Sequence, residues 1–194
     1  MTLDFFFDPG CPWTWRTSRW AAEVAPRRDV TLRWRAYSLD IKNELPPSTA
    51  QGALRIVEAV WADHGDGPIG RLYTEVGTRF HLQTDTTLDG LAAALEAAGL
   101  DAGYLAAAHD ERWDAEIRGS MADALGVVGE EVGVPIMVLD GAVGLSGPVM
   151  ERAPTGDEAV ALWDHVIALA RYPGFYEVKR SRPMTLPSRR DRPL

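Results

Sequence analysis

Residues 5–20 of this 194-residue chain read Phe5-Phe6-Phe7-Asp8-Pro9-Gly10-Cys11-Pro12-Trp13-Thr14-Trp15-Arg16-Thr17-Ser18-Arg19-Trp20, and this stretch decides the fold. The apolar run at residues 3–7 is typical of a strand inside a parallel sheet. Asp8, Pro9 and Gly10 are turn residues, and Pro12 suits the first position of a helix. The pattern therefore predicts a buried strand, a tight turn, and a helix that begins directly after Cys11.

Cys11 is the only cysteine of the chain, and we expect it at the N-terminus of this first helix. The unpaired backbone N–H groups and the positive end of the helix dipole favour an anion there. Both effects favour the ionised thiolate, which is the reactive form of cysteine. The competing interpretation is an inert thiol, because free cysteine is among the most buried residue types.

The order strand, turn, Cys-Pro-Trp and helix resembles the active site of the thioredoxin superfamily in its DsbA-like branch. That family carries a C-x-x-C motif, whereas this chain has Cys11-Pro12-Trp13-Thr14, with threonine in place of the second cysteine. The string from Asp8 to Trp20 is most similar to the mycothiol-dependent nitroreductase type. The resemblance implies an α/β, thioredoxin-like fold with an inserted all-helical subdomain.

Two later stretches carry the same resemblance. Val134-Pro135 precedes an apolar run, and proline at the entry of a strand is unusual. The resemblance implies that this proline is cis and faces the active cysteine. Residues 173–182, close to the end of the chain, also resemble the nitroreductase-type members.

The rest of the chain follows from periodicity and turn signals. We expect a helix over residues 12–25 and a parallel strand over residues 30–38. Because Arg33 and Arg35 share one face of that strand, it should lie at an edge of the sheet or have an exposed face. Residues 39–50 read as a polar linker and residues 51–126 as almost entirely helical. Strands follow at residues 132–139 and 142–146, joined by an Asp140-Gly141 hairpin turn, and a last helix covers residues 157–171. The predicted thioredoxin-like domain comprises residues 1–45 and 128–194, with residues 46–127 as the helical insertion.

Composition excludes several classes of function. The net charge of −8 argues against nucleic acid and against anionic membranes as partners. No apolar run reaches the roughly 18 residues of a membrane span, and we see no basic region followed by an apolar one at the N-terminus. One cysteine permits no internal disulfide, which fits a reducing compartment, so we expect a cytoplasmic location.

With no second cysteine, Cys11 can act only as a monothiol, and the resolving thiol must come from outside. We expect mycothiol or glutathione as a co-substrate and no tightly bound cofactor. The hydroxyl of Thr14 either donates a hydrogen bond to the thiolate, bonds a cofactor sulfur, or caps its own helix. Trp13 is expected at the site and Trp20 in the core, while Pro12, Val134 and Pro135 are expected to bind the thiol or the substrate.

Three functions remain open. The first is a small-thiol-dependent oxidoreductase, in which Cys11 forms a mixed disulfide and the substrate is a nitroaromatic compound or a disulfide. The second resembles kappa-class glutathione transferases and hydroxychromene-carboxylate isomerases, in which Thr14 would activate a bound thiol. The third is a redox-inactive binding protein. A homodimer is left open as well.

Metal and histidine chemistry receive little support from the sequence. The four histidines lie at positions that do not match the spacing of metal ligands, so we expect no metal site: His64, His81, His109 and His165. A histidine that is remote in sequence can still meet Cys11 in space, and this alternative is open.

Overall fold

The computed structural model describes residues 1–181, which form a mixed α/β fold, as the sequence predicts. In chain order the elements are β1 (Thr2–Phe7), α1 (Pro12–Val24), η1 (Ala25–Arg27), β2 (Thr31–Ala36), α2 (Leu39–Lys42), α3 (Thr49–His64), α4 (Ile69–Gly77), η2 (Thr78–Gln83), α5 (Leu88–Ala97), η3 (Ala102–His109), η4 (Glu111–Trp113), α6 (Asp114–Val128), β3 (Ile136–Leu139), β4 (Val143–Ser146) and α7 (Gly156–Ala170).

The four strands form one sheet in the order β2-β1-β3-β4. β1 pairs with β2 in parallel, and α1 makes the crossover, as the predicted βαβ unit requires. β1 pairs with β3 antiparallel, and β3 continues into β4 through the hairpin turn at Asp140-Gly141. β2 lies at the edge of the sheet, as predicted, and its Arg33 pairs with Asp4 of the neighbouring strand.

Side chains alternate between the two faces of β1, and each face has its own cover. Phe5 and Phe7 contact Trp34 edge to face, and Phe7 also stacks on Tyr73 of α4 at 4.0 Å. Phe6 points to the opposite face, where Arg35 lies over its ring and pairs with Asp123 of α6. The central strand is therefore buried on both faces, which explains its three consecutive phenylalanines.

Trp20 lies in the core, as predicted. It is fully buried, and its ring centre lies 5.5 Å from that of Trp163 on α7. Its indole N–H donates to the carbonyl of Ala159, so the one polar atom of the side chain is satisfied inside the core. This contact joins the first helix to the last helix.

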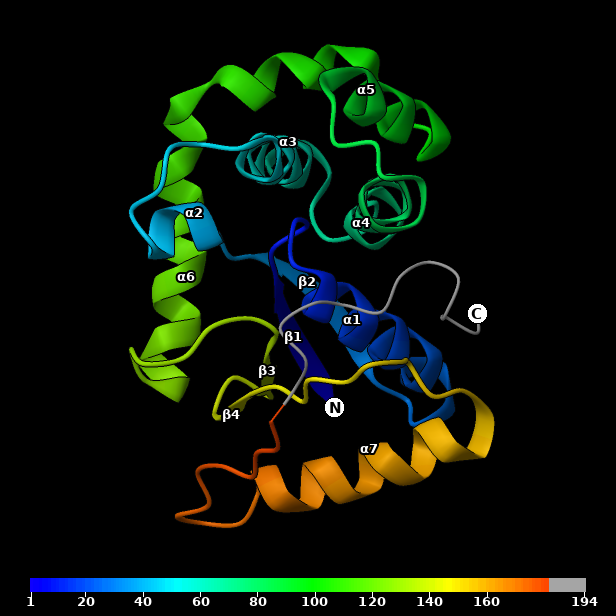
Figure 1. Ribbon diagram of the computed structural model, residues 1–194, viewed down its shortest axis with the longest axis vertical. Coiled ribbons are helices and arrows are strands. Elements are labelled where there is room, and N and C mark those ends of the chain that lie inside the picture. The colour runs from blue at the N-terminus through cyan, green and yellow to red at the C-terminus, as the bar shows by residue number, and fades with distance from the viewer. Residues whose placement is uncertain (182–194) are drawn as a thin grey trace.

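Between β2 and β3 every regular element of the described chain is helical, and Figure 1 shows α3, α4 and α5 gathered beyond one end of the sheet. The linker predicted at residues 39–50 is wrong in part, because α2 begins at Leu39 with Ser38 as its N-cap. Within the predicted helical block of residues 51–126, the chain changes from an α-helix to a π-helix at Thr78–Gln83. The domain boundaries at residues 45/46 and 127/128 stay predictions.

The strand predicted at residues 132–139 is too long, because β3 begins only at Ile136. Proline has no N–H for a ladder hydrogen bond, and Pro135 directly precedes the observed strand. Near the end of the chain, residues 175–181 form no helix or strand. Arg182 and the Arg189-Arg190 pair lie outside the described residues.

A buried ion pair fixes the helical region internally. Arg55 of α3, with 5 % of its side chain exposed, donates to both carboxylate oxygens of Asp114 at 2.7 and 2.8 Å. Gln51 donates to the same carboxylate, and Arg55 also donates to the carbonyl of Ala108. The Arg55 guanidinium holds the pKa of Asp114 below its usual range. The pair joins α3 to the beginning of α6 and to η3.

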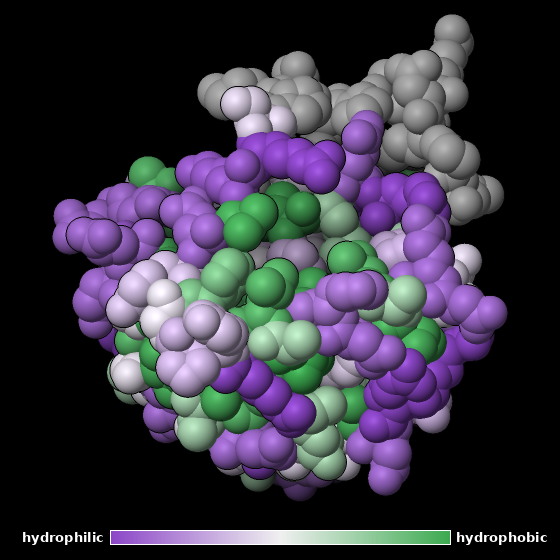
Figure 2. All heavy atoms as spheres, turned by 90° about the horizontal axis from the view of Figure 1, so that it is seen from below, coloured by the Kyte–Doolittle hydropathy of each residue, from purple (hydrophilic) through white to green (hydrophobic). Residues whose placement is uncertain are grey.

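The surface around α7 combines apolar and polar side chains (Figure 2). Exposed apolar side chains at this end include Met1 and Leu169, and Arg171 donates to the sulfur of Met1. Within residues 1–181, none of the helices combines the length and the apolar character that crossing a membrane requires.

We predict that Asp114→Ala lowers the free energy of unfolding by about 3–5 kcal/mol, because it leaves a buried guanidinium without its counter-ion. Urea denaturation measures the effect. The control is Arg152→Ala, which breaks an exposed ion pair with Glu158 and should cost less than about 1 kcal/mol. Equal losses in the two variants would contradict the prediction.

Candidate functional site

Cys11 occupies the N-cap position of α1, directly after the turn that follows β1. Its backbone N–H donates to the carbonyl of Asp8 at 3.1 Å, and its carbonyl accepts from the N–H of Trp15 at 3.1 Å. The side chain is buried but 7 % of the residue remains exposed. The only thiol therefore lies, buried, at the beginning of a 13-residue helix, where an anion is favoured.

The turn before Cys11 is held by the side chain of Asp8, which is 3 % exposed. One carboxylate oxygen accepts from the N–H of Gly10, and the other from the N–H of Leu39, each at 2.7 Å. Burial raises the pKa of Asp8 to about 6, although these backbone N–H groups oppose the rise. Asp8 thus ties the turn to the beginning of α2, a role that its place in a turn motif does not reveal.

Thr14 lies in the first turn of α1 and is fully buried. Its hydroxyl is buried without a hydrogen-bond partner among the described residues, and it does not cap the helix. The predicted hydrogen bond from Thr14 to the sulfur of Cys11 is therefore not formed in this structure. Trp13, by contrast, is only half-buried, and the guanidinium of Arg16 lies 5.3 Å from its ring centre. Pro12 is half-buried at the first helical position.

The Val134-Pro135 stretch reaches the same end of the sheet. The peptide bond between these residues is cis. The pairing of β1 with β3 ends with Phe6 opposite Ile136, so Pro135 lies one step further, where β1 runs into the turn. The carbonyl of Pro135 accepts from the N–H of Gly147 at 2.7 Å. The carbonyl of Pro148, the residue after Gly147, accepts from the hydroxyl of Thr17 at 2.7 Å. The proline segment is thereby connected to α1.

A histidine that is distant in sequence also reaches the turn. Nε2 of His81, in the π-helix η2, lies 2.8 Å from the carbonyl oxygen of Pro9, two residues before Cys11. The His81 ring stacks on Trp15 of α1, with ring centres 5.7 Å apart and planes at 24°. The sequence carries no local signal for this contact, because it joins residues 72 positions apart.

Behind Trp15 lies a buried cation. The guanidinium of Arg19 lies 4.1 Å from the Trp15 ring centre and donates to the hydroxyl of Thr74. Burial lowers the pKa of Arg19, and among the described residues no carboxylate forms an ion pair with it. Burial also raises the pKa of the neighbouring Tyr73, although the Ser18 hydroxyl and the Arg19 charge oppose this rise. The interior behind Trp15 is thus aromatic and holds a guanidinium.

Together these groups limit the chemistry of the site. A single thiol at a helix N-terminus can attack an electrophilic sulfur, and the surrounding aromatic side chains exclude bulk water. Within residues 1–181 no cluster of three or more histidine, cysteine, aspartate or glutamate side chains has the arrangement of a metal site.

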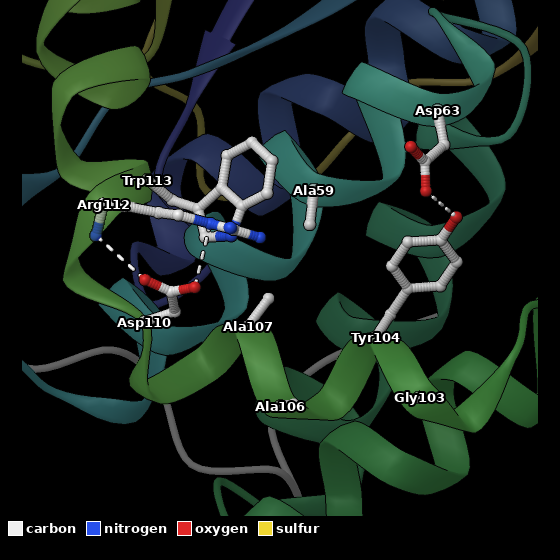
Figure 3. Close-up of a pocket in the computed structure, with 9 residues that line it drawn as sticks. All are labelled: Ala59, Asp63, Gly103, Tyr104, Ala106, Ala107, Asp110, Arg112 and Trp113. Carbon is white, nitrogen blue, oxygen red and sulfur yellow. Dashed lines mark hydrogen bonds and ion pairs between the residues drawn. The ribbon is translucent and has the colours of Figure 1, made fainter.

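A separate pocket of about 270 Å³ opens in the helical region and contains none of the predicted site residues. Figure 3 shows it between the η3 segment and α3, with the indole of Trp113 pointing into it and the hydroxyl of Tyr104 bonded to Asp63 at 2.6 Å. The Nε1 atom of Trp113 is buried without a partner among the described residues.

Comparison with known protein sequences supports the resemblance. Residues 10–180 match the sequence model of the Rv2466c-like family, which is described as mycothiol-dependent nitroreductase Rv2466c. The chain is also 31% identical over 193 residues to the uncharacterized protein Rv2286c of Mycobacterium tuberculosis. That alignment covers 93% of this chain and 82% of the relative.

Solved structures show the same fold. The cytosolic disulfide reductase DsbM from Pseudomonas aeruginosa superposes with a TM-score of 0.60 at 15% identity, covering 87% of this chain and 100% of that one. A periplasmic thioredoxin-like protein from Salmonella enterica serovar Typhimurium gives a TM-score of 0.58 at 20% identity, covering 86% and 84%. At such identities the likeness concerns the fold, which is the predicted thioredoxin-like fold of the DsbA-like type.

We predict a pH dependence of stability that originates in Asp8. Its pKa is about 6 in the folded chain and 3.8 as the ordinary value, so the folded state binds the proton more tightly. Its contribution to stability is therefore full below pH 3.8 and is lost as the pH rises through about 6. Between pH 4 and 7 the ionisation of Asp8 should lower the free energy of unfolding of the wild type by about 2–3 kcal/mol. Asp8→Asn should lack this part of the decrease.

Urea denaturation at several pH values measures this difference. Glu131→Gln, at an exposed carboxylate, is the control and should follow the wild-type profile. An Asp8→Asn profile as steep as that of the wild type would show that Asp8 ionises in the folded chain as it does in water.

Proposed function

Because the chain belongs to the Rv2466c-like family of thiol-dependent oxidoreductases, we propose that it is a monothiol enzyme that uses mycothiol or a similar small thiol as its co-substrate. The observation that carries the proposal is the position of its only thiol. Cys11 occupies the N-cap position of α1, is 7 % exposed as a residue, and lies at the end of the sheet that Pro135 also reaches.

The proposed reaction is thiol–disulfide exchange in two steps. In the first step the Cys11 thiolate attacks a disulfide, so that a bond to its sulfur forms, the original S–S bond breaks, and one thiolate leaves. In the second step a small thiolate attacks the outer sulfur of the mixed disulfide and releases the Cys11 thiolate. Over two such cycles the two electrons come from two small thiols, which leave as one disulfide, and the substrate disulfide becomes two thiols.

Nitroaromatic compounds are a second proposed substrate class, suggested by the description of the family. Reduction of a nitro group to a nitroso group takes two electrons and two protons and releases water. Two small thiols supply both and become one disulfide. The half-buried ring of Trp13 offers a flat apolar surface beside the thiol for such a substrate.

Other side chains have proposed roles in positioning. Pro12 begins the helix that presents the thiol, and Val134 and Pro135 would form the opposite wall against which the small thiol lies. Thr14 stands where C-x-x-C proteins carry the second cysteine, and its unpartnered hydroxyl is available to a thiolate after a small movement of the first turn. We also propose that no cofactor is tightly bound and that the protein acts in the cytoplasm.

The transferase-like alternative depends on the same hydroxyl. In that reaction Thr14 would activate a bound small thiol directly, and Cys11 would be dispensable. The unpartnered hydroxyl favours this alternative, whereas its complete burial separates it from solvent and from a ligand. A redox-inactive binding protein is the third alternative.

We predict that the wild type forms one mixed disulfide with an oxidised small thiol at neutral pH, detected by intact-protein mass spectrometry, and that Cys11→Ser forms none. With a small disulfide as substrate and mycothiol as reductant, Cys11→Ser should lose activity by about 1,000-fold or more, because the nucleophile is absent. Thr14→Val, which keeps the shape but removes the hydroxyl, should lose about tenfold if that hydroxyl stabilises the thiolate.

Thr86→Val is the matched control, because Thr86 is exposed in the helical region, and it should keep full activity. Conjugation of an aromatic electrophile that survives in Cys11→Ser and fails in Thr14→Val would replace the proposal with the transferase-like alternative. A wild type without any adduct would leave only a binding function.

A further inference from the structure

We propose that His81 is a positioning residue for Cys11, which holds the turn before the thiol from the side of the helical region. A role of His81 in catalysis rests on the proposed function, whereas the contact between His81 and Pro9 is present whatever reaction the protein performs. The inference assigns a role to the segment Thr78–Gln83, which lies 72 positions from the turn that it contacts.

The first support is a directed hydrogen bond. A backbone carbonyl only accepts, so Nε2 of His81, 2.8 Å from the oxygen of Pro9, carries the proton and donates it. Pro9 lies between Asp8, which fixes the turn from the side of α2, and Cys11. The turn is therefore held from two directions by residues that belong to different elements.

The second support is the packing of Trp15, one helical turn after Cys11. Its ring stacks on His81, and the guanidinium of Arg19 lies 4.1 Å from its centre. Gly77 provides the space for this ring, because a Cβ atom on Gly77 would lie only 2.2 Å from two Trp15 ring atoms. The helix that presents the thiol and the segment that carries His81 are thus fitted to each other at close range.

The third support is the local backbone of the histidine segment. The π-helix is rare and occurs mostly as single-turn insertions, frequently at functional sites. Here it begins directly after Gly77 and ends before Thr84, which has a φ of 58° in the left-handed region. A regular α-helix through these residues would rotate His81 relative to Gly77, so the π-helical turn sets the direction in which the histidine points.

The test separates the hydrogen bond from the stacking contact. His81→Phe keeps a flat ring on Trp15 but removes the N–H, and His81→Gln keeps an N–H donor but removes the ring. The control is His109→Phe, at an exposed histidine of the helical region. Three quantities are measured on the full-length protein: amide hydrogen exchange at Gly10 and Cys11, the rate constant of Cys11 alkylation by iodoacetamide, and the urea midpoint.

In His81→Phe we expect the two amides to exchange about tenfold faster and alkylation to proceed about tenfold more slowly, because one hydrogen bond to the turn is lost. His81→Gln should restore most of both values. Gly77→Ala should reproduce the defect without any change at His81, since it displaces Trp15, whereas Gly119→Ala, where a Cβ meets open space, should not. The urea midpoint of His81→Phe should fall only by the amount that one lost hydrogen bond accounts for, about fivefold in the equilibrium constant of unfolding, which equals about 1 kcal/mol in the free energy of unfolding.

The inference would be overturned if His81→Phe exchanged its amides and reacted with iodoacetamide at the rates of the wild type. It would also be overturned if His109→Phe showed the same changes in exchange and alkylation as His81→Phe. The same samples separate this result from the proposed function. If the wild type forms no mixed disulfide with oxidised small thiol while exchange at Gly10 still responds to His81, the proposed function fails and the positioning role stands. If the mixed disulfide forms equally fast in all variants, the positioning role fails alone.

Discussion

The hydrogen bonds of the buried Asp8 carboxylate are the constraint on which the site depends. They join three points of the chain: the end of the central strand, the turn before Cys11, and the beginning of α2 after the edge strand. Removing a carboxylate from water is unfavourable, and the raised pKa of Asp8 reports that penalty. The hydrogen bonds that the Asp8 carboxylate accepts from backbone N–H groups offset part of this penalty. They also fix the direction in which the turn leaves the sheet.

That direction determines where distant segments can meet the thiol. The proline segment approaches from β3, because the pairing of β1 with β3 ends beside the turn. The histidine segment approaches from the helical region and contacts the carbonyl of Pro9. On the side of the helical region, the Trp15 ring contacts Tyr73 edge to face and lies 4.1 Å from the guanidinium of Arg19. The site is thus assembled at one end of the sheet from elements far apart in the chain.

Thr14 stands where the C-x-x-C motif has its second cysteine, and the framework around it is that of the DsbA-like fold. Thr14 is buried in the first turn of α1, and the helix, the cis-proline segment and the sheet keep the arrangement of the DsbA-like fold. A thiol in such a framework retains the electrostatic environment of a helix N-terminus, but it has no partner within the chain to complete a redox cycle. Chemistry at this site consequently depends on what a second molecule supplies.

Local rules explain what could be predicted from the sequence alone. The apolar run at β1, the Asp8-Pro9-Gly10 turn, Pro12 at the first helical position and the Asp140-Gly141 hairpin depend on residues close together in the chain, and the structure confirms each of them. The resemblance added the fold, the helical region and the place of Pro135. The domain boundaries and the roles of Cys11, Thr14, Trp13, Val134 and Pro135 in catalysis or binding stay predictions.

Tertiary structure alone decided the rest. The contact between His81 and Pro9, the burial of the Thr14 hydroxyl, the link from Asp8 to Leu39 and the late start of β3 at Ile136 depend on which segments pack against one another. No periodicity records such contacts, because a hydrogen bond across 72 positions leaves no pattern in either segment. The sequence alone determined that a single thiol begins a helix after a buried strand, since that depends on neighbouring residues. The groups that surround the thiol were determined only by folding, since they come from the whole chain.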